Sequence, residues 1–554
     1  MRKLFLLTIP FLTRNTYIFL FSLLGLIYII GLFVPLIDND SAHHASIALH
    51  MYLTGDYASL VDQSGDYLDK PHLLFWLTAI SYKIFGVTSF AYKLPSFLFT
   101  ILGTYSVYRL GKTLYNNEAG KLAALIIASA FAYILANNDV RMDAILTASI
   151  AFACWQLSEF IHHKKLSKVA GAALALAIGF STKGHIAVFV PGVFVFFYIL
   201  YRKDWNTFLD WKWLLLVILF GVFISPVVYA YYLQYNLHPE KMVRGRDHIN
   251  GVKFILLNQS IERFSGGMGG DAKNDYLFFL HSFLWAFAPW SILTYIAVAG
   301  RIKDFLQRKE EWGTTAAFVA VALVVSLSGF KLPHYLNIVF PLSAVMTAVY
   351  ILKKEPGQKW ILTIQLVVTV LLLLLTAFIN VWAFPVQKPW IMVGTILLLA
   401  AVFYFIRSAA YSRLQKAVTT SAATMALAFF LLNSNFYPRL LQYQAGQALA
   451  ETTKGKADPA DVYIRPHSYS ASYVFYSKSM FRPFNDSLLQ TGKKVWLLTE
   501  PHYLEEVKNE GYQLGTMYTA PHFRVTKLNL KFMNPATRDK ECSQMMIVEI
   551  TGKK

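Results

Sequence analysis

WILTIQLVVTVLLLLLTAFINVWAF, at residues 360–384, is an apolar stretch without an ionisable side chain. A helix needs about 20 apolar residues to cross the hydrocarbon core of a bilayer, so this stretch predicts a membrane span. Similar runs recur along most of the chain, at about 16–36, 92–111, 120–138, 143–161, 167–183, 186–201, 211–233, 275–299, 313–330, 335–352, 389–407 and 417–435. The sequence therefore predicts an all-α polytopic membrane protein with about thirteen transmembrane helices.

The composition of the 554-residue chain supports this class. Hydrophobic residues make up 56% of the chain and charged residues only 15%, which excludes a disordered polymer and a soluble globule of this length. The net charge of +19 is best explained by basic cytoplasmic loops, and we predict no nucleic-acid partner. The two cysteines, Cys154 and Cys542, offer neither a disulfide framework nor a cysteine zinc site.

The basic loops predict the orientation of the chain. If thirteen spans alternate, clusters such as Arg202-Lys203 and Lys353-Lys354 fall on one side, which is cytoplasmic by the positive-inside rule. The N-terminus is then inside, the first apolar run is a retained span, and the C-terminus is outside. Residues 72–87 are apolar but short, and a span there would place the later basic loops outside. We therefore predict an interfacial or re-entrant helix within a long outer loop at 37–91.

The composition changes after residue 435. Alternating patterns at 462–464, 473–476 and 495–498 indicate strands, and 503–507 has a helical pattern. We predict a membrane domain at 1–435 and a small periplasmic α/β domain at 436–554.

Polar side chains gather in the predicted outer loops. They are Asp38, Asp40, His43, His44, Asp56, Asp69, Lys70 and His72 in the first loop, Asp139, Arg141 and Asp143 in the second, Lys183 and His185 in the third, Arg244, Arg246, His248, Glu262 and Arg263 in the fourth, and Lys331, His334 and Tyr335 in the fifth. Ionisable groups so close to a bilayer are costly unless they are paired or hydrated. Five loops of this kind on one face predict a functional cavity.

Several of these groups also have plain structural explanations. Asp38-Asn39-Asp40 is a D-x-D triplet that could hold Mg²⁺ or Mn²⁺, or Asp40 could cap a helix. His43 and His44 are weak candidates for metal ligands, because adjacent helical residues face different directions. We predict no obligatory metal and leave a divalent cation open.

The basic residues have alternatives too. Lys70 could form a surface ion pair with Asp69, and Lys183 could extend to the lipid headgroups. Lys331 and Arg263 could bind anionic lipids without catalysis.

Transfer from a lipid-linked phosphate is the chemistry that needs this mixture of groups. A departing phosphate requires lysine, arginine or a metal to offset its charge, and the acceptor requires a carboxylate. Apolar walls would hold a prenyl chain. An ATP-driven reaction lacks support, because the sequence contains no G-x-x-x-x-G-K-[ST] loop.

An ordered series of short motifs runs through the predicted membrane domain. The motifs are Asp40 with Ile47-Ala48, Thr54-Gly55-Asp56-Tyr57, Tyr67-Leu68-Asp69-Lys70-Pro71, Phe75-Trp76-Leu77, Arg141-Met142-Asp143, Thr182-Lys183-Gly184, Ile261-Glu262-Arg263-Phe264, Ala288-Pro289-Trp290 and Lys331-Leu332-Pro333-His334-Tyr335. This series resembles the bacterial aminoarabinose transferases, which belong to the GT-C superfamily together with the protein O-mannosyltransferases.

The resemblance implies a sugar transfer from a polyprenyl-phosphate donor at the periplasmic face of the bacterial inner membrane. It implies catalytic roles for Asp40 and Asp143 and contacts of Lys70 with the donor phosphate. Further phosphate or substrate contacts would come from Arg263, Lys331 and Tyr335. From their loops we add Asp38, Asp69 and Lys183 as residues of the cavity.

The acceptor is less defined than the donor. The family usually has Asp-Glu-x-Arg-Tyr where this chain has Asp40-Ser41-Ala42-His43-His44, so neither the sugar nor the acceptor follows from the resemblance. An aminoarabinose-like pentose moved to lipid A or lipopolysaccharide is one prediction, and a protein or polysaccharide acceptor is the alternative. A lipid-linked sugar transporter is less favoured, because the sequence has no evident repeat and gathers its polar residues at one face.

Overall fold

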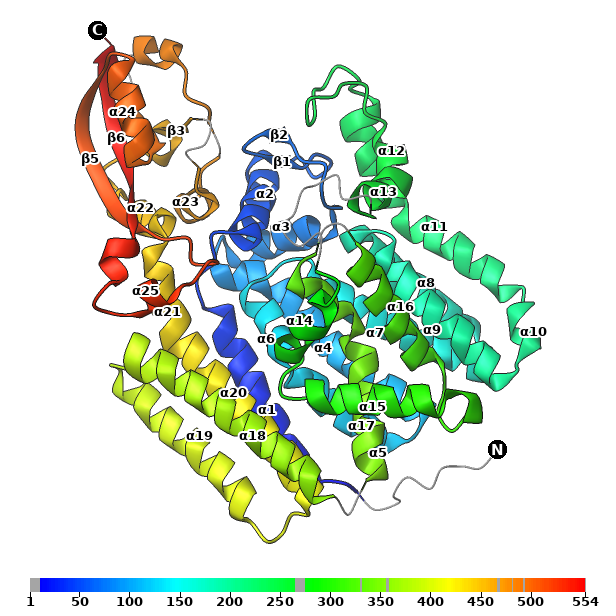
Figure 1. The fold of residues 1–554 in the computed structure, drawn as a ribbon. Coiled ribbons are helices and arrows are strands. Elements are labelled where there is room, and N and C mark those ends of the chain that lie inside the picture. Colours follow the sequence, from blue (N-terminus) through cyan, green and yellow to red (C-terminus); the bar gives the residue numbers. More distant parts are fainter. Residues whose placement is uncertain are drawn as a thin grey trace.

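A bundle of helices with a small sheet beside one end forms the structure (Figure 1). The structure is a computed structural model that describes residues 10–264, 275–328, 331–354, 358–465, 469–480, 482–491 and 494–553. The predicted fold class, an all-α polytopic membrane protein with a small C-terminal α/β part, is confirmed.

The first half of the chain contributes helices and one short hairpin. They are α1 (Arg14–Leu32), α2 (Asp40–Thr54), β1 (Val61–Asp62), β2 (Gly65–Asp66), α3 (Leu73–Phe85), α4 (Ser89–Leu114), α5 (Asn117–Ala128), α6 (Phe131–Asn138), α7 (Asp143–His163), α8 (Leu166–Lys183), α9 (Ile186–Arg202), α10 (Trp205–Phe208), α11 (Lys212–Tyr231), α12 (Gly251–Lys253) and α13 (Gln259–Phe264). The predicted interfacial segment at 72–87 corresponds to α3, a 13-residue helix.

The later membrane helices complete the bundle. They are α14 (Phe278–Ala286), α15 (Ser291–Lys303), α16 (Gly313–Leu327), α17 (Phe340–Lys353), α18 (Lys359–Ala377), α19 (Pro389–Arg407) and α20 (Arg413–Leu431). Each predicted span corresponds to one helix or to a helix broken by a bend. The run at 275–299, for example, is divided between α14 and α15 at Phe287–Trp290.

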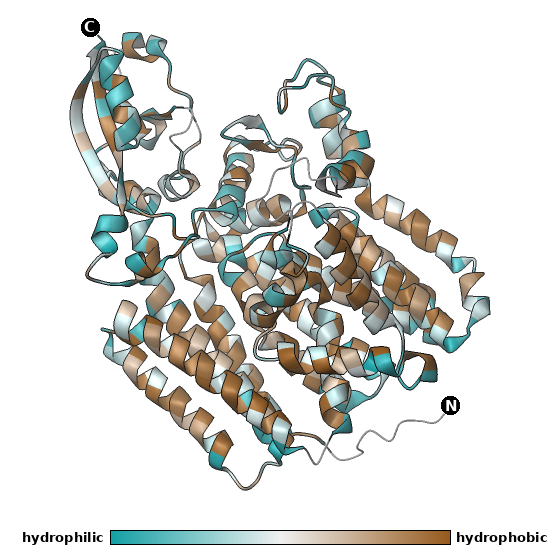
Figure 2. Cartoon of the chain, viewed as in Figure 1, coloured by the Kyte–Doolittle hydropathy of each residue, from teal (hydrophilic) through white to brown (hydrophobic). Residues whose placement is uncertain are grey.

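The outer surface of the bundle is apolar. Leu374 in α18 is 61% exposed and Leu397 in α19 is 66% exposed, and brown, hydrophobic ribbon extends along these helices (Figure 2). Such a surface is unfavourable in water and favourable against lipid chains, where helices also satisfy their own backbone groups. The chain is therefore a multi-pass membrane protein.

Fewer helices than the predicted thirteen are long enough to cross a membrane by themselves. In the described ranges, seven helices are long and apolar enough to cross a membrane, or eight if α5 and α6 form one span bent by 53°. The prediction of thirteen also counted helices that are shorter, such as α9 and α16. Short helices can still lie within a membrane when other helices surround them, because the surrounding protein shields their ends.

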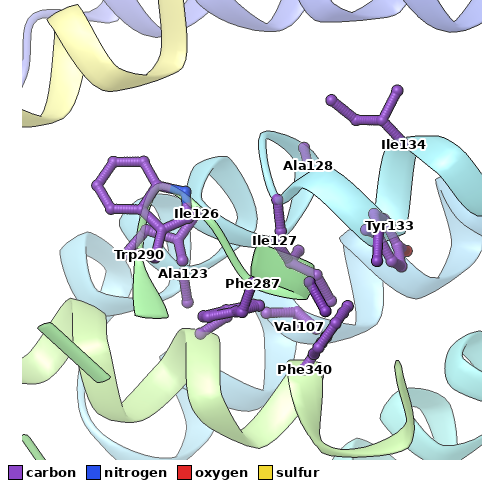
Figure 3. Packing of buried hydrophobic residues seen from close by; sticks show 14 of the residues in the cluster. Val107, Ala123, Ile126, Ile127, Ala128, Tyr133, Ile134, Phe287, Trp290 and Phe340 are labelled. Atoms are coloured by element: carbon purple, nitrogen blue, oxygen red, sulfur yellow. The ribbon is translucent and has the colours of Figure 1, made fainter. Parts of the chain in front are cut away.

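Aromatic side chains from the link between α14 and α15 and from α17 pack against α5. Phe287, Trp290 and Phe340 pack against Ile126 and Ile127, and all five are fully buried (Figure 3). The indole N–H of Trp290 donates to Ser129 Oγ at 3.1 Å, so its polar atom is satisfied inside this core.

The C-terminal part is built on a four-stranded sheet of order β3-β4-β6-β5. Its elements are α21 (Tyr437–Leu440), α22 (Ala445–Thr452), β3 (Val462–Ile464), α23 (Ala471–Ser477), β4 (Val495–Thr499), α24 (Pro501–Asn509), β5 (Tyr512–His522), α25 (Leu530–Met533) and β6 (Ser543–Lys553). β3 and β4 pair in parallel, whereas β6 pairs antiparallel with both β4 and β5.

Most of the predicted C-terminal elements are present. The strands at 462–464 and 495–498 and the helix at 503–507 are confirmed. The strand predicted at 473–476 is wrong, because this segment is the helix α23. Ser470 caps that helix by accepting a hydrogen bond from the Tyr473 N–H. The division of the chain at residue 435 stays a prediction.

Removal of the Trp290 side chain is expected to destabilise the bundle. Trp290→Ala leaves a cavity between α5, α14 and α17 and removes one hydrogen bond, so we expect the free energy of unfolding to fall by about 3–5 kcal/mol. Chemical or thermal unfolding in detergent measures this change. Trp211→Ala is the control, since Trp211 is 63% exposed, and equal losses in both variants would contradict the packing argument.

Candidate active site

The first acidic residue of the site starts α2. Asn39 caps this helix, because its side chain accepts a hydrogen bond from the Ser41 N–H at 2.8 Å. The residue that caps α2 is therefore Asn39. The interpretation of Asp40 as the cap is wrong. Asp40 is the first helical residue, and its side chain is 51% exposed. Its carboxylate can therefore reach a ligand.

Arg141 connects Asp40 to the start of α7. Its Nη1 donates to Asp40 Oδ2 at 3.0 Å, and its Nη2 lies 3.0 Å from Asp139 Oδ2. The same Nη1 is 3.4 Å from His334 Nδ1. We call Asp40, Asp139, Arg141 and His334 the Arg141 cluster. Burial alone would lower the pKa of the Arg141 guanidinium, but Asp139 and Asp40 raise it above its ordinary value, so this cation is permanent.

A buried ion pair lies beside this cluster. Asp143 is the first residue of α7 and Lys183 is the last residue of α8, and Lys183 Nζ donates to Asp143 Oδ1 at 2.7 Å. Both side chains are less than 10% exposed. Lys183 Nζ also lies 4.6 Å from the centre of the Tyr335 ring, and His334 Nε2 is 4.0 Å from Asp143 Oδ2. Lys183 is thus held inside the protein and does not extend to the headgroups.

A second chain of charges starts at the predicted donor lysine. Lys70 Nζ donates to Asp69 Oδ2 at 2.7 Å, and Arg244 Nη2 donates to Asp69 Oδ1 at 3.1 Å. Arg244 Nη1 continues to Glu262 Oε2 at 3.3 Å. We call Lys70, Asp69, Arg244 and Glu262 the Asp69 chain. It joins the loop after β2 to the loop between α11 and α13, at the end of the bundle where α2 also lies (Figure 1).

A cavity adjoins the Asp69 chain. It has a volume of about 470 Å³, and its lining includes Leu68, Arg244, Lys253, Phe254 and Glu262. Its walls therefore combine apolar, basic and acidic groups, and they share Arg244 and Glu262 with the Asp69 chain.

The charges of the Arg141 cluster and of the Asp69 chain act on each other. Burial alone would raise the pKa of the Asp40 carboxyl, but His44, Arg141, Lys70 and His334 together lower it below its ordinary value. Lys70 is therefore close enough to Asp40 to favour its ionised form. His44 lies one turn after Asp40 on α2, and burial lowers the pKa of this imidazole to about 3 despite the opposing effect of Asp40.

The structure brings most of the predicted site residues together. Asp40, Asp143, Lys183 and Tyr335 lie in or beside the Arg141 cluster. Asp69 and Lys70 belong to the Asp69 chain, whose Lys70 acts on Asp40. Whether these residues are catalytic stays a prediction.

Two predicted site residues, Asp38 and Lys331, bond to partners outside the Arg141 cluster and the Asp69 chain, and the side chain of a third is not described. The carboxylate of Asp38 is turned away from Asp40, toward Ser470 and Ser472 near α23. Lys331 donates to the backbone carbonyl of Asp275 at 2.8 Å and lies 5.4 Å from the Tyr276 ring. Arg263 belongs to α13, and its side chain lies outside the described part of the structure.

Five other outer-loop residues have no individual role in the sequence-based prediction: Asp139, Arg141, Arg244, Glu262 and His334. Arg141 had a usable signal, because it stands between Asp139 and Asp143 just before a span. Arg244 had a weaker one. It sits in a loop without periodicity, and only the fold brings it to Asp69.

A metal ion has no evident set of ligands in the described ranges. No group of three or more His, Cys, Asp or Glu side chains converges there. His43 pairs with Asp62 at 3.2 Å, and the carboxylates of Asp38 and Asp40 have separate partners. The prediction that no metal is obligatory stays a prediction.

Comparison with known proteins supports the resemblance noted from the motifs. Residues 69–229 match the family model of the dolichyl-phosphate-mannose-protein mannosyltransferases. An undecaprenyl phosphate-alpha-4-amino-4-deoxy-L-arabinose arabinosyl transferase of Pseudomonas fluorescens is 26% identical over 318 residues, which is 55% of this chain and 53% of that protein. The corresponding transferase of Pseudomonas paraeruginosa is 25% identical over 353 residues, or 60% of this chain and 59% of that protein.

The solved structures extend the similarity to the whole fold. ArnT from Cupriavidus metallidurans bound to undecaprenyl phosphate matches with a TM-score of 0.74 and 16% identity, over 97% of this chain and 98% of that one. The chain has the ArnT fold. The apo form of ArnT from Cupriavidus metallidurans matches this chain with a TM-score of 0.72. The predicted resemblance to the aminoarabinose transferases and their mannosyltransferase relatives is confirmed. The sequence matches cover only a little over half the length of the two transferases, 53% and 59%.

The Asp143–Lys183 pair yields a stability prediction. Lys183→Met leaves the Asp143 carboxylate buried without its cation, so we expect the free energy of unfolding to fall by about 3–5 kcal/mol. Unfolding of purified protein in detergent measures the loss. In Asp143→Asn/Lys183→Met, where no buried charge is left over, we expect a large part of the loss to be regained. A double variant as unstable as Lys183→Met would contradict the ion-pair explanation.

Proposed function

We propose that this protein is a membrane glycosyltransferase that moves a sugar from a polyprenyl-phosphate donor to an acceptor. The observation that carries the proposal is the half-exposed Asp40 carboxylate, ionised by its neighbours and within electrostatic range of Lys70. A carboxylate for the acceptor beside cations for a departing phosphate is what this transfer requires. The family model match at 69–229 and the ArnT fold give the proposal further support.

In the proposed reaction the acceptor oxygen forms a bond to the anomeric carbon of the sugar. The bond between that carbon and the phosphate oxygen breaks, and the polyprenyl phosphate leaves with the electron pair. The acceptor proton passes to the Asp40 carboxylate. Lys70 offsets the negative charge that develops on the leaving phosphate, and it is held by Asp69, which is held in turn by Arg244.

The low pKa of Asp40 bears on its role. A carboxylate with a lowered pKa is ionised at neutral pH but is a weak proton acceptor. We therefore propose that Asp40 aligns the acceptor hydroxyl by accepting its hydrogen bond. It takes the proton late, when bond formation has made the hydroxyl acidic.

Asp143 has a different proposed role. Its carboxylate is buried and bound to Lys183, so it is placed to orient a cation and not to meet the acceptor directly. Lys183, held under the Tyr335 ring, then contributes positive charge at a defined position beside the Arg141 cluster. We propose that Arg263 and Lys331 assist Lys70 at the departing phosphate.

The sugar and the acceptor are the finer part of the proposal. The names of the relatives suggest an aminoarabinose-like pentose as the sugar, and we propose a lipid A or lipopolysaccharide acceptor. The departure at Ser41-Ala42-His43-His44 keeps a protein or polysaccharide acceptor as the alternative. We also propose the bacterial inner membrane, with the site and the C-terminus periplasmic. No obligatory cofactor is proposed, and a divalent cation stays open.

Substitution at Asp40 and Lys70 tests the assignment. Transfer of sugar from a synthetic polyprenyl-phosphate donor is measured with purified protein in detergent or vesicles. We expect Asp40→Asn to lower kcat about 10²–10⁴-fold, because it removes the aligning carboxylate. We expect Lys70→Ala to lower kcat about 10²–10³-fold, because the leaving phosphate loses a cation.

Two exposed residues, one just after α2 and one in α3, serve as matched controls. Asp56→Asn and Lys83→Ala make the same chemical changes outside the proposed site and are expected to leave transfer unchanged. Full turnover in both Asp40→Asn and Lys70→Ala would remove the site assignment.

The pH dependence gives an independent test. Transfer requires ionised Asp40, so activity is present above the pKa of this carboxyl in the folded protein and is lost as the pH falls through it. Arg141 lowers that pKa, so Arg141→Gln is expected to raise it and to move the acidic limb of the kcat/KM profile to higher pH. An acidic limb at the same pH in Arg141→Gln and in the unmodified protein would mean that another group governs it.

A further inference from the structure

The short segment before Asp40 is bonded to the C-terminal part of the chain. The Leu36 N–H donates to Tyr476 Oη at 2.8 Å, and Gln444 Nε2 donates to the Leu36 carbonyl at 2.5 Å. The Asp38 N–H donates to Gln444 Oε1 at 2.8 Å. The backbone groups of an otherwise irregular turn are thus satisfied by residues more than 400 positions away.

The Asp38 carboxylate makes three further hydrogen bonds to the C-terminal part. Ser470 Oγ donates to Asp38 Oδ2 at 2.6 Å, and Ser472 Oγ donates to the same atom at 2.7 Å. The Ser472 N–H donates to Asp38 Oδ1 at 3.1 Å. We call Asp38, Ser470 and Ser472 the serine clamp. Both serines are almost fully buried, at 1% and 0% exposed, so water does not compete for these bonds.

Packing supports the serine clamp from two sides. α23 lies against α2, where Ala471, Val474 and Phe475 share one apolar cluster with Ala45 and Leu49. On the other side, a Cβ on Gly446 of α22 would lie 2.2 Å from both serine Oγ atoms. Only glycine allows α22 to approach so closely, and the serines are therefore held in place.

We propose that the serine clamp positions the catalytic carboxylate, so that the C-terminal part of the chain is a working component of the transferase site. This inference rests on the proposed function. Asn39 alone separates Asp38 from Asp40, and its side chain caps α2 on one side and donates to Asp139 at 3.3 Å on the other. A turn fixed at Asp38 and at Asn39 leaves Asp40 little freedom. Asp38 is a positioning residue and does not meet the substrate.

The clamp has a clear kinetic signature. Misplacement of a reacting group by about 1 Å can cost about 10²-fold in rate. We expect Ser470→Ala/Ser472→Ala to lower kcat about 10–100-fold. The KM for the polyprenyl-phosphate donor should change by less than about twofold, because the Asp69 chain is untouched.

Substitution of Asp38 distinguishes positioning from chemistry. Asp38→Ala is expected to match the double serine variant, and combining all three changes should add little, since they break one set of bonds. Asp38→Asn is expected to retain most of the activity, because its amide oxygen can accept from the Ser472 N–H and its amide nitrogen can donate to a serine Oγ. Ser477→Ala/Ser479→Ala is the matched control, as that serine pair lies in the same region and bonds to itself.

Hydrogen exchange adds a readout that does not depend on turnover. We expect peptides covering 34–46 to exchange faster in Ser470→Ala/Ser472→Ala than in the unmodified protein or the control, with peptides around Lys70 unchanged. Unchanged kcat and unchanged exchange in this variant would overturn the proposal. So would an inactive Asp38→Ala beside a fully active double serine variant, because Asp38 would then act in the cavity itself. Absence of sugar transfer by the unmodified protein would contradict the proposed function. The hydrogen-exchange result would still test whether the serine clamp fixes the turn before α2.

Discussion

The ion pair between Arg141 and Asp40 is the interaction on which the candidate site depends. Arg141 sits on the short link between α6 and α7, and it bonds to Asp139 on that link as well as to Asp40 on α2. One guanidinium therefore fixes the start of α2 relative to the start of α7. It also lowers the pKa of the Asp40 carboxyl, which partial burial would otherwise raise. Without it, two carboxylates would face each other at the edge of an apolar bundle, which is unfavourable for both.

The bilayer explains why the charges meet at a rim of the bundle. Helices satisfy their own backbone groups within the membrane, so irregular backbone is confined to protein-covered or hydrated ends. Asp40 and Asp143 each begin a helix, and Lys183 ends one. Negative charge is favoured at the first turn of a helix and positive charge at the last. The sequence positions at which helices begin and end are therefore also the positions that suit the charges of the site.

The sequence predicts the helices well because their signal is local. The run at 360–384 becomes α18 and the π-helical turn that follows it, and its apolar composition alone decides this. Sequence does not predict how many runs are long enough to span, since bends such as the one between α5 and α6 depend on packing. The segment at 473–476 alternates like a strand, yet the cap at Ser470 and the contact with α2 make it a helix. In that case a tertiary contact outweighs a weak local pattern.

The candidate site shows the same contrast between what local sequence predicts and what tertiary contacts decide. The loops predict which residues are polar and on which face they gather, and Asp40, Asp69, Lys70, Asp143, Lys183 and Tyr335 do gather. The loop sequences do not predict the direction in which each side chain points. Asp38 and Asp40 belong to one triplet, and as a D-x-D motif they suggest a shared ligand. In the structure the helix begins between them, so the carboxylate of Asp38 turns to Ser472 and that of Asp40 to Arg141.

That divergence gives the triplet a physical explanation that needs no metal. Asp38 lies in the turn before the cap Asn39, whereas Asp40 is the first helical residue, so the two side chains leave the chain in different directions. One carboxylate can then hold the turn while the other stays half-exposed for a ligand. The holding carboxylate finds its donors outside the membrane helices. The sheet-bearing C-terminal part supplies them at Ser470 and Ser472. The hydrogen bonds that join α23 to the turn before α2 are therefore the same ones that we propose to position Asp40.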